Sequence, residues 1–233
     1  MAGKLDLRDI RSEMVINRVS KRQEKALDRA VQRVISALQD KFGNLTFGHQ
    51  AQWLLRDVIA DLEKTFPDID FHYYFERSAM KPDGGILSLI SKDEKAYPVL
   101  IAEKKNQGTN DLRALEGLAK QAKGNAIERL GKNVIGFRTA MKSEGIFPFV
   151  CFGDGCDFAD DSSILDRVVT IAMFGNLNKE YVVDIGADRI FDRGTFYFRA
   201  PEWTEDEMFE RCLSIATKSV YHYFAAYGEE SFI

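Results

Sequence analysis

Three residues of the chain combine the side-chain types and the spacing that hydrolysis of a phosphodiester requires. Asp83 stands between a proline and two glycines at the start of an apolar stretch, and Glu103 and Lys105 follow the most apolar run of the sequence. Side chains two residues apart on a strand share one face, so Glu103 and Lys105 would point one way and Lys104 the other. If the strand after Asp83 pairs with the strand that ends at Glu103, two carboxylates and an ammonium group meet at one end of a sheet.

This group of side chains would suit metal-assisted chemistry. Two carboxylates supply the oxygen ligands that Mg²⁺ prefers, and a metal held there polarises a phosphoryl oxygen and lowers the pKa of a bound water. The lysine can orient or deprotonate that water and offset charge in the transition state. Each half of the pattern is unspecific, because Pro-Asp-Gly-Gly is also a common turn and charged residues at a strand end also form a solvated rim.

The surrounding sequence alternates between helical and extended patterns. Apolar residues at spacings of three and four predict helices over 5–42, 49–66, 125–142 and 205–227. Short apolar or aromatic runs predict strands over 71–78, 86–90, 97–105, 147–153, 167–175, 181–184 and 195–199. The run from Val99 to Ala102 is apolar on both faces, which is typical of a fully buried strand. The predicted fold class is α/β (α+β), with a central mixed β-sheet flanked by helices.

Composition and charge exclude several classes of protein. No apolar run approaches the roughly 18 residues of a membrane span, and the N-terminus lacks the apolar stretch of a signal peptide. Three cysteines without CxxC spacing and three scattered histidines argue against a disulfide framework or a zinc site. We therefore predict a reduced, cytoplasmic protein with no membrane partner.

The charge distribution is uneven although the net charge is only −4. Basic residues outnumber acidic ones in 1–50 and 81–145, and acidic residues predominate in 146–233. One face could therefore approach a polyanion while the chain stays acidic overall. An ordinary solvated surface explains the same distribution equally well.

Three segments, in this order, resemble a known family. They are K-P-D-G-G-I (81–86), A-E-K-K-N-Q-G (102–108) and G-N-A-I-E-R (124–129). The first two are similar to the two halves of the PD-(D/E)xK nuclease motif, and all three together closely resemble the EcoRI-type branch of type II restriction endonucleases. F-P-F-V-C-F (147–152) also resembles that family's next core strand.

The resemblance implies a restriction-endonuclease-like fold and a type II site-specific deoxyribonuclease of bacterial origin. It implies that Asp83 and Glu103 ligate Mg²⁺ and that Lys105 is the catalytic lysine. In the family, the GNA-x-ER element accompanies palindromic sites containing AATT, which homodimers cut to leave 5′ overhangs. A cognate DNA methyltransferase is the expected functional partner.

The resemblance also assigns residues to DNA recognition. Base contacts in the major groove would come from Asn125, Glu128 and Arg129, together with the backbone around Gly124 and Ala126. By position alone, Lys81 and Lys123 could contact phosphates, although a solvated lysine explains Lys81 equally well.

The chemistry of the third segment agrees with this assignment in part. Asn125 follows a glycine where a helix opens, which is the position of an N-cap, and an asparagine can make two hydrogen bonds to adenine. Arginine more often contacts guanine, so residue type alone does not assign Arg129 to adenine. Glu128 could accept a hydrogen bond from a base amino group or hold Arg129 in place. A capped helix with a surface ion pair would have the same sequence.

The predicted function is therefore Mg²⁺-dependent, sequence-specific cleavage of double-stranded DNA by a homodimer. We predict one domain over 1–233, with a helical N-terminal part (1–70), a catalytic and recognition core (71–175) and C-terminal strands and helix (176–233). Two alternatives stay open on the same fold. One is a structure-specific repair or recombination nuclease, which the GNAIER segment argues against. The other is a non-catalytic DNA-binding module, which the intact set of Asp83, Glu103 and Lys105 argues against.

Overall fold

The computed structural model describes residues 3–106, 117–118, 125–159, 162, 164–171, 177–182 and 194–233, with most of their side chains from Lys21 onward. The helices are α1 (Gly3–Lys41), α2 (Leu55–Thr65), α4 (Asn125–Ala140), α5 (Ile164–Ile171) and α6 (Glu205–Tyr227), with short 3₁₀ turns at Cys156–Phe158 and Glu229–Ser231. The main strands are β1 (Thr46–Gln50), β4 (Ile86–Ile90), β5 (Ala96–Asn106), β6 (Phe149–Asp154) and β7 (Thr195–Arg199). Two short strands, β2 (Trp53–Leu54) and β3 (Ala79–Met80), pair separately.

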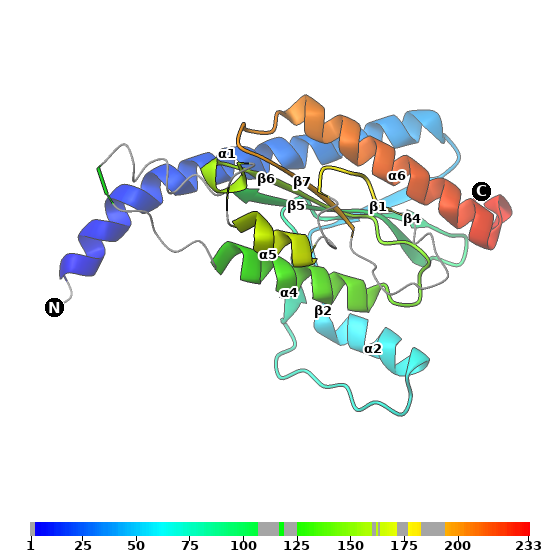
Figure 1. The fold of residues 1–233 in the computed structure, drawn as a ribbon. Coiled ribbons are helices and arrows are strands. Elements are labelled where there is room, and N and C mark those ends of the chain that lie inside the picture. Colours follow the sequence, from blue (N-terminus) through cyan, green and yellow to red (C-terminus); the bar gives the residue numbers. More distant parts are fainter. Residues whose placement is uncertain are drawn as a thin grey trace.

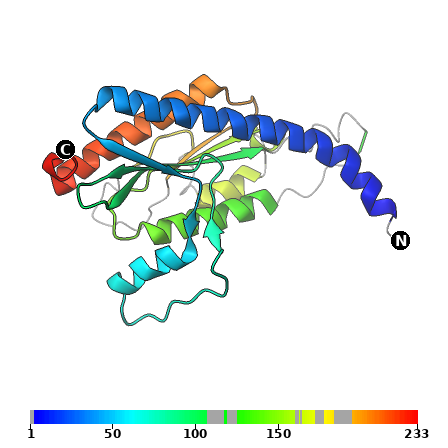
Figure 2. The same ribbon diagram turned by 180° about the vertical axis from the view of Figure 1, so that it is seen from behind.

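The main sheet is mixed, and its strands lie in the order β1-β4-β5-β6-β7. β4 pairs antiparallel with both β1 and β5, whereas β6 pairs parallel with both β5 and β7. Helices α1 and α6 cover one face of the sheet, and α4 and α5 cover the other (Figures 1 and 2). This arrangement confirms the predicted fold class. The central strand is β5, which carries Glu103 and Lys105 near its carboxyl end.

The core forms where the apolar faces of α1 and α6 meet the sheet. In α1, residues at spacings of three and four have at most 1% of their surface exposed: Leu27, Ala30, Val31, Val34 and Leu38. The predicted buried run from Val99 to Ala102 is likewise at most 1% exposed. Burying one such large aliphatic side chain stabilises the fold by about 1.5–3 kcal/mol. The sheet that carries the candidate site is therefore supported on both faces.

The segment 167–175 is not the strand that the sequence predicts. Its described part belongs to the helix α5, which packs beside α4 and buries Ile164 and Val168, four residues apart. A short apolar run does not separate a strand from a buried helix by itself. The topology favours a helix in this segment, because the parallel strands β6 and β7 need a crossover connection, which is usually helical.

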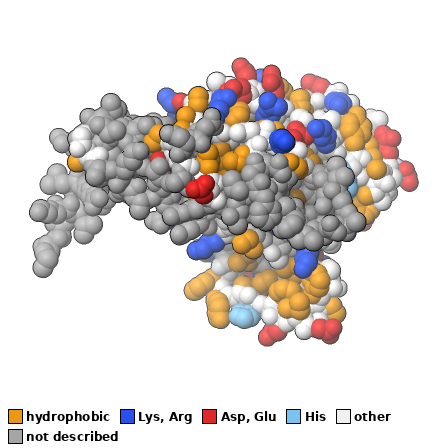
Figure 3. All heavy atoms as spheres, in the orientation of Figure 1, with side chains coloured by type: hydrophobic (Ala, Val, Ile, Leu, Met, Phe, Trp, Pro, Cys, Tyr) orange, Lys and Arg blue, Asp and Glu red, His pale blue; other side chains and the backbone are white. Residues whose placement is uncertain are grey.

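Two predictions near the N-terminal third are also wrong. The segment 71–78 contains no strand, and Tyr74 and Phe75 are 84% and 74% exposed. Aromatic residues favour strands mainly by packing against neighbours, and these two side chains are too exposed to pack in that way. The part of the molecule that contains α2 projects from the body and shows several hydrophobic side chains on its surface (Figures 1 and 3). The helix predicted over 49–66 begins only at Leu55, because residues 46–54 contribute β1 and β2 instead.

Most of the remaining predicted elements are confirmed, but residues 181 and 182 of the strand predicted near 181–184 are not in a strand. α1, β4, β5, α4, β6, β7 and α6 lie within a few residues of the predicted bounds, and the strand predicted near 181–184 falls partly outside the described residues. Among the described residues, no helix combines the length and the apolar character that crossing a membrane requires.

Candidate active site

A tight turn places Asp83 against the end of β5. The backbone N–H of Gly84 donates to the carbonyl of Ala102 at 2.9 Å, so the turn is bonded to the strand that carries Glu103. A Cβ atom at position 84 would lie 2.9 Å from the Cβ of Ala102 and 3.1 Å from Cγ of Leu27 in α1. Gly85 has a φ of 74°, which side chains disfavour. The two glycines after Asp83 therefore allow the close approach that brings Asp83 to the site.

Asp83, Glu103 and Lys105 converge as the sequence predicts. The backbone N–H of Asp83 donates to Oε2 of Glu103 at 3.2 Å, and the ammonium group of Lys105 bonds to Oε1 of Glu103. The same ammonium group lies 3.7 Å from Oδ2 of Asp83, which also accepts a hydrogen bond from the backbone N–H of Lys104 at 3.0 Å. Side-chain exposure is 27% for Asp83, 18% for Lys105 and 2% for Glu103. Asp83 and Lys105 are therefore accessible to a substrate, whereas Glu103 is held behind them.

The electrostatics follow from this packing. Burial raises the pKa of Glu103, and the nearby carboxylate of Asp83 adds to the increase although Lys105 opposes it. Burial alone would lower the pKa of Lys105, but the carboxylates of Glu103 and Asp83 outweigh it and raise that pKa. Lys105 is consequently a stable cation beside two carboxylates.

The other face of β5 carries a buried polar cluster. The ammonium group of Lys104 bonds to Oδ2 of Asp154 in β6, and both side chains are at most 2% exposed. Asp154 also accepts hydrogen bonds from Asn106 at 2.8 Å, from Gln23 at 3.2 Å and from the backbone N–H of Trp203 at 3.2 Å. Lys104 thus points away from Lys105. The contacts of Asp154 join the ends of β5 and β6 to α1 and to the residues before α6.

The structure adds two residues that the sequence did not single out. Asn133 of α4 donates from Nδ2 to Oε1 of Glu103 at 3.1 Å. Glu24 of α1 lies within electrostatic range of Asp83, and burial together with that carboxylate raises the pKa of Glu24. The sequence pattern that could have pointed to Asn133 is its spacing of four residues from Arg129, because residues four apart share one face of a helix. No local pattern points from Glu24 to a turn so distant in the sequence.

The predicted recognition residues are placed only in part. α4 begins at Asn125, as predicted, but Asn125 is the first helical residue and not the cap that precedes the helix. Arg129 is exposed on this helix, and Lys81 is exposed just after β3. Lys123 and Gly124 lie outside the described residues, as do the side chains of Asn125, Ala126 and Glu128.

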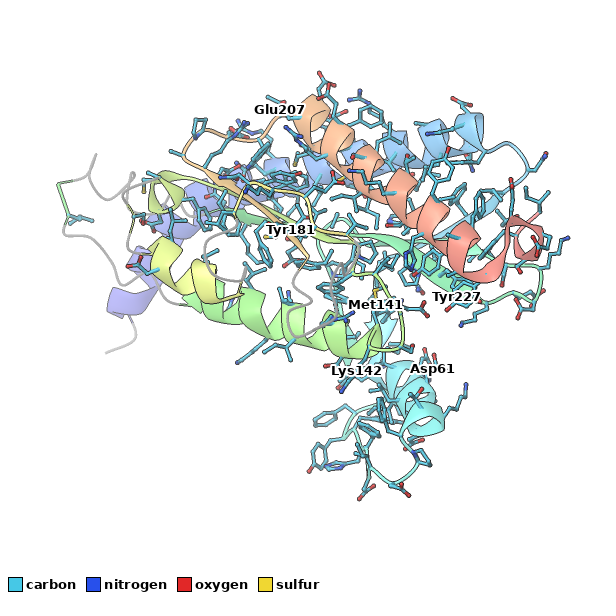
Figure 4. The ribbon with its side chains drawn as sticks, turned by 45° about the vertical axis from the view of Figure 1, so that its right-hand side comes forward. Asp61, Met141, Lys142, Tyr181, Glu207 and Tyr227 are labelled. Carbon is cyan, nitrogen blue, oxygen red and sulfur yellow. The ribbon has the colours of Figure 1, made fainter. Side chains whose placement is uncertain are left out.

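A separate cavity of about 590 Å³ lies between α2 and the C-terminal end of α4. Asp61, Met141 and Lys142 line it (Figure 4), and so does the buried hydroxyl of Ser88, which has no hydrogen-bond partner among the described residues. None of the three predicted catalytic residues lines this cavity. The candidate active site is therefore the carboxyl end of β5 and is separate from this cavity.

The donor set at β5 fits a hard divalent cation. Asp83 and Glu103 offer carboxylate oxygens side by side, and Oδ1 of Asp83 makes no hydrogen bond within the described part of the chain. Magnesium commonly takes one or two protein carboxylates and keeps several waters. Two ligands therefore suffice, and the described residues contain no denser cluster of His, Cys, Asp and Glu suited to a metal.

The comparisons with known proteins agree with the geometry. The restriction endonuclease EcoRI family matches residues 11–164, which include the turn at Asp83, all of β5 and α4. The chain belongs to this family. The type II restriction enzyme RsrI of Cereibacter sphaeroides is 30% identical in an alignment that covers 80% of this chain and 79% of that enzyme. The type II restriction enzyme EcoRI of Escherichia coli is 28% identical in an alignment that covers 86% of this chain and 85% of that enzyme.

Membership of the EcoRI family confirms two of the predictions made from the sequence. The resemblance to the EcoRI-type branch is correct, and the protein is an enzyme of the site-specific deoxyribonuclease class. The individual roles of Asp83, Glu103 and Lys105, and of the recognition residues on α4, stay predictions.

Proposed function

We propose that this chain is a Mg²⁺-dependent type II restriction endonuclease that cuts double-stranded DNA at a palindrome containing AATT and leaves 5′ overhangs. The observation that carries the proposal is the convergence of Asp83, Glu103 and Lys105 at one end of the central strand, within a chain of the EcoRI family. Two carboxylates and a cation in this arrangement suit in-line attack of water on a phosphodiester.

The proposed role of each residue in catalysis follows from its contacts. A bound divalent cation would polarise the scissile phosphate and lower the pKa of a water that it holds. Asp83 and Glu103 would hold that cation, with Glu103 fixed by its buried position and Asp83 open to the substrate. Lys105 would orient the attacking water and offset the negative charge that develops on the phosphate, because its neighbours keep it protonated.

Recognition is proposed to come from the start of α4. A helix that points its first residues at the major groove can read base edges there. Asn125 is the first residue of α4 and Arg129 is exposed one turn later, which supports the assignment of Asn125, Glu128 and Arg129 to base contacts. Gly124 and Ala126 would contribute backbone contacts, and Lys81 and Lys123 would contact phosphates.

A palindromic site implies a two-fold symmetric enzyme, so we propose a homodimer with one active site for each strand. A location in the bacterial cytoplasm is proposed with it, and a cognate DNA methyltransferase is proposed from the resemblance alone.

The test is digestion of a fully sequenced phage DNA with the purified protein and Mg²⁺, followed by sequencing of the fragment ends. Uniform ends at one AATT-containing palindrome are expected. Ragged ends, or cuts that follow DNA structure, would support the repair nuclease instead. Specific binding without any cutting would support the non-catalytic module.

A further inference from the structure

The only contact to the Glu103 carboxylate from outside the sheet and its turn, among the described residues, comes from α4. Oε2 accepts a hydrogen bond from the backbone of Asp83, and Oε1 is bonded by Lys105 of the same strand. Asn133 provides the remaining hydrogen bond, from Nδ2 to Oε1 at 3.1 Å. The orientation of this buried carboxylate therefore depends in part on where α4 lies.

The same helix begins with the segment assigned to base recognition. Asn125, Arg129 and Asn133 follow one another at spacings of four residues, so they lie along one face of α4. Eight residues of α-helix span about 12 Å, which is the distance along the axis from Asn125 to Asn133. An α-helix of this length moves as a rigid element, so a shift at its first turn is transmitted to its third.

We infer that Asn133 is a positioning residue that couples DNA recognition by α4 to the orientation of Glu103. The inference rests on the proposed function, because it assumes that α4 contacts bases and that Glu103 is a metal ligand. In this arrangement, correct docking of α4 on its site sets the Glu103 carboxylate in its working orientation. A wrong base displaces the start of α4 and, through Asn133, the carboxylate as well.

An asparagine suits this task because its amide donates a hydrogen bond without adding charge. A lysine or arginine at position 133 would neutralise Glu103 and compete with a cation for it. An aspartate would have no donor and would face Glu103 with a second negative charge. The amide leaves the charge of Glu103 available while restricting its rotation, as partners of metal ligands commonly do.

The test compares Asn133→Ala and Asn133→Asp with wild type and with Thr139→Ala. Thr139 is exposed on the same helix and bonds only to its own helix backbone among the described residues, so it is a matched control. Single-turnover cleavage is measured in Mg²⁺ on the cognate site and on a site with one base changed. Binding to both DNAs is measured in Ca²⁺, and the stability of each variant is measured by urea unfolding.

The expected result for Asn133→Ala is a loss of cognate cleavage rate on the order of 10- to 100-fold, with cognate binding in Ca²⁺ changed less than about threefold. The rate on the altered site should fall less, because Glu103 is already misplaced there, so the ratio of the two rates falls. Asn133→Asp should lose more cognate rate than Asn133→Ala, although it is nearly isosteric. Thr139→Ala should match wild type in both rates.

Three outcomes would overturn the inference. If Asn133→Ala cuts both sites at wild-type rates, the contact has no role. If both rates fall by the same factor, or fall in step with lost stability, Asn133 supports the fold or the site without coupling it to recognition. In both cases the proposed function stands as long as wild type cuts at one palindrome. A wild-type protein that binds DNA but does not cut it would remove the proposed function and this inference together.

Discussion

The buried pair of Lys104 and Asp154 gives the sharpest test of the structural argument. Replacing Lys104 by methionine keeps most of the volume of the side chain and removes its charge, which leaves Asp154 buried without a cation. Breaking a buried ion pair by removing one partner usually costs about 3–5 kcal/mol. Asp154 keeps three neutral donors, from Asn106, Gln23 and the backbone of Trp203, and a hydrogen bond to a charged group contributes about 1.5–3 kcal/mol. We therefore expect Lys104→Met to destabilise by about 3 kcal/mol, at the low end of the range.

The opposite substitution should cost more. Asp154→Leu removes the acceptor shared by four donors and leaves the ammonium group of Lys104 buried without the carboxylate that it bonds, so we expect a cost of about 5 kcal/mol. The double variant removes both charges, and its cost should be well below the sum of the two single costs because the partners are coupled. A double variant that costs less stability than the sum of the two single variants distinguishes a buried ion pair from two independent packing contacts.

Urea unfolding followed by tryptophan fluorescence would measure these costs. The control is Arg22→Ala, which breaks an exposed pair with Glu202 at 2.7 Å and should change stability by less than about 1 kcal/mol. A cost below about 1 kcal/mol for Lys104→Met, or a smaller cost for Asp154→Leu than for Lys104→Met, would refute the reasoning.

Three further predictions concern catalysis, recognition and acid stability. Glu103→Ala or Lys105→Ala should abolish cleavage of phage DNA while specific binding in Ca²⁺ is largely kept, and wild-type cutting rates in both would contradict their catalytic assignment. Asn125→Ala should lose about 1–3 kcal/mol of specific affinity in competition with random DNA, and an unchanged preference would remove Asn125 from the recognition set. The hydrogen bond from Arg199 lowers the pKa of Glu207 from 4.5 to about 2, so this carboxylate stabilises the fold fully above pH 4.5 and loses its effect as the pH falls toward 2. Glu207→Gln should therefore flatten the dependence of unfolding free energy on pH in that window, and an unchanged slope would contradict the assignment.

The sequence predicts the centre of the site well because the relevant signals are local. Strand alternation places Glu103 and Lys105 on one face, and the glycines after Asp83 mark a turn that can approach a neighbouring strand closely. The pairing of β4 with β5 then follows from their adjacency in the chain. The same short-range logic correctly locates the start of α4 at Asn125.

Other features depend on contacts between segments that are far apart in the sequence, so local patterns do not predict them. The strand predicted at 167–175 is wrong because the parallel pairing of β6 with β7, which requires a crossover connection that is usually helical, is a property of the whole sheet. The contact of Asn133 with Glu103 joins residues 30 positions apart on different elements. The proximity of Glu24 to Asp83 depends on how α1 packs over Gly84, which only the folded chain reveals.

Two adjacent lysines with the same chemistry have different roles, because the pleat of β5 points their side chains to opposite faces of the sheet. Lys105 faces the carboxylates of the site, whereas Lys104 is buried on the other face against Asp154. A slip of one residue in the pairing of β5 with β6 would exchange the two faces, so that Lys104 would approach the substrate side and lose its buried partner. The correct register pairs Asn106 with Asp154 and bonds their side chains, while Lys104 reaches the same carboxylate from two residues earlier. A slipped register would leave Asp154 buried without these partners, at a cost of several kcal/mol. The buried pair that stabilises the sheet thus also determines that Glu103 and Lys105, and not Lys104, face the substrate side of the sheet.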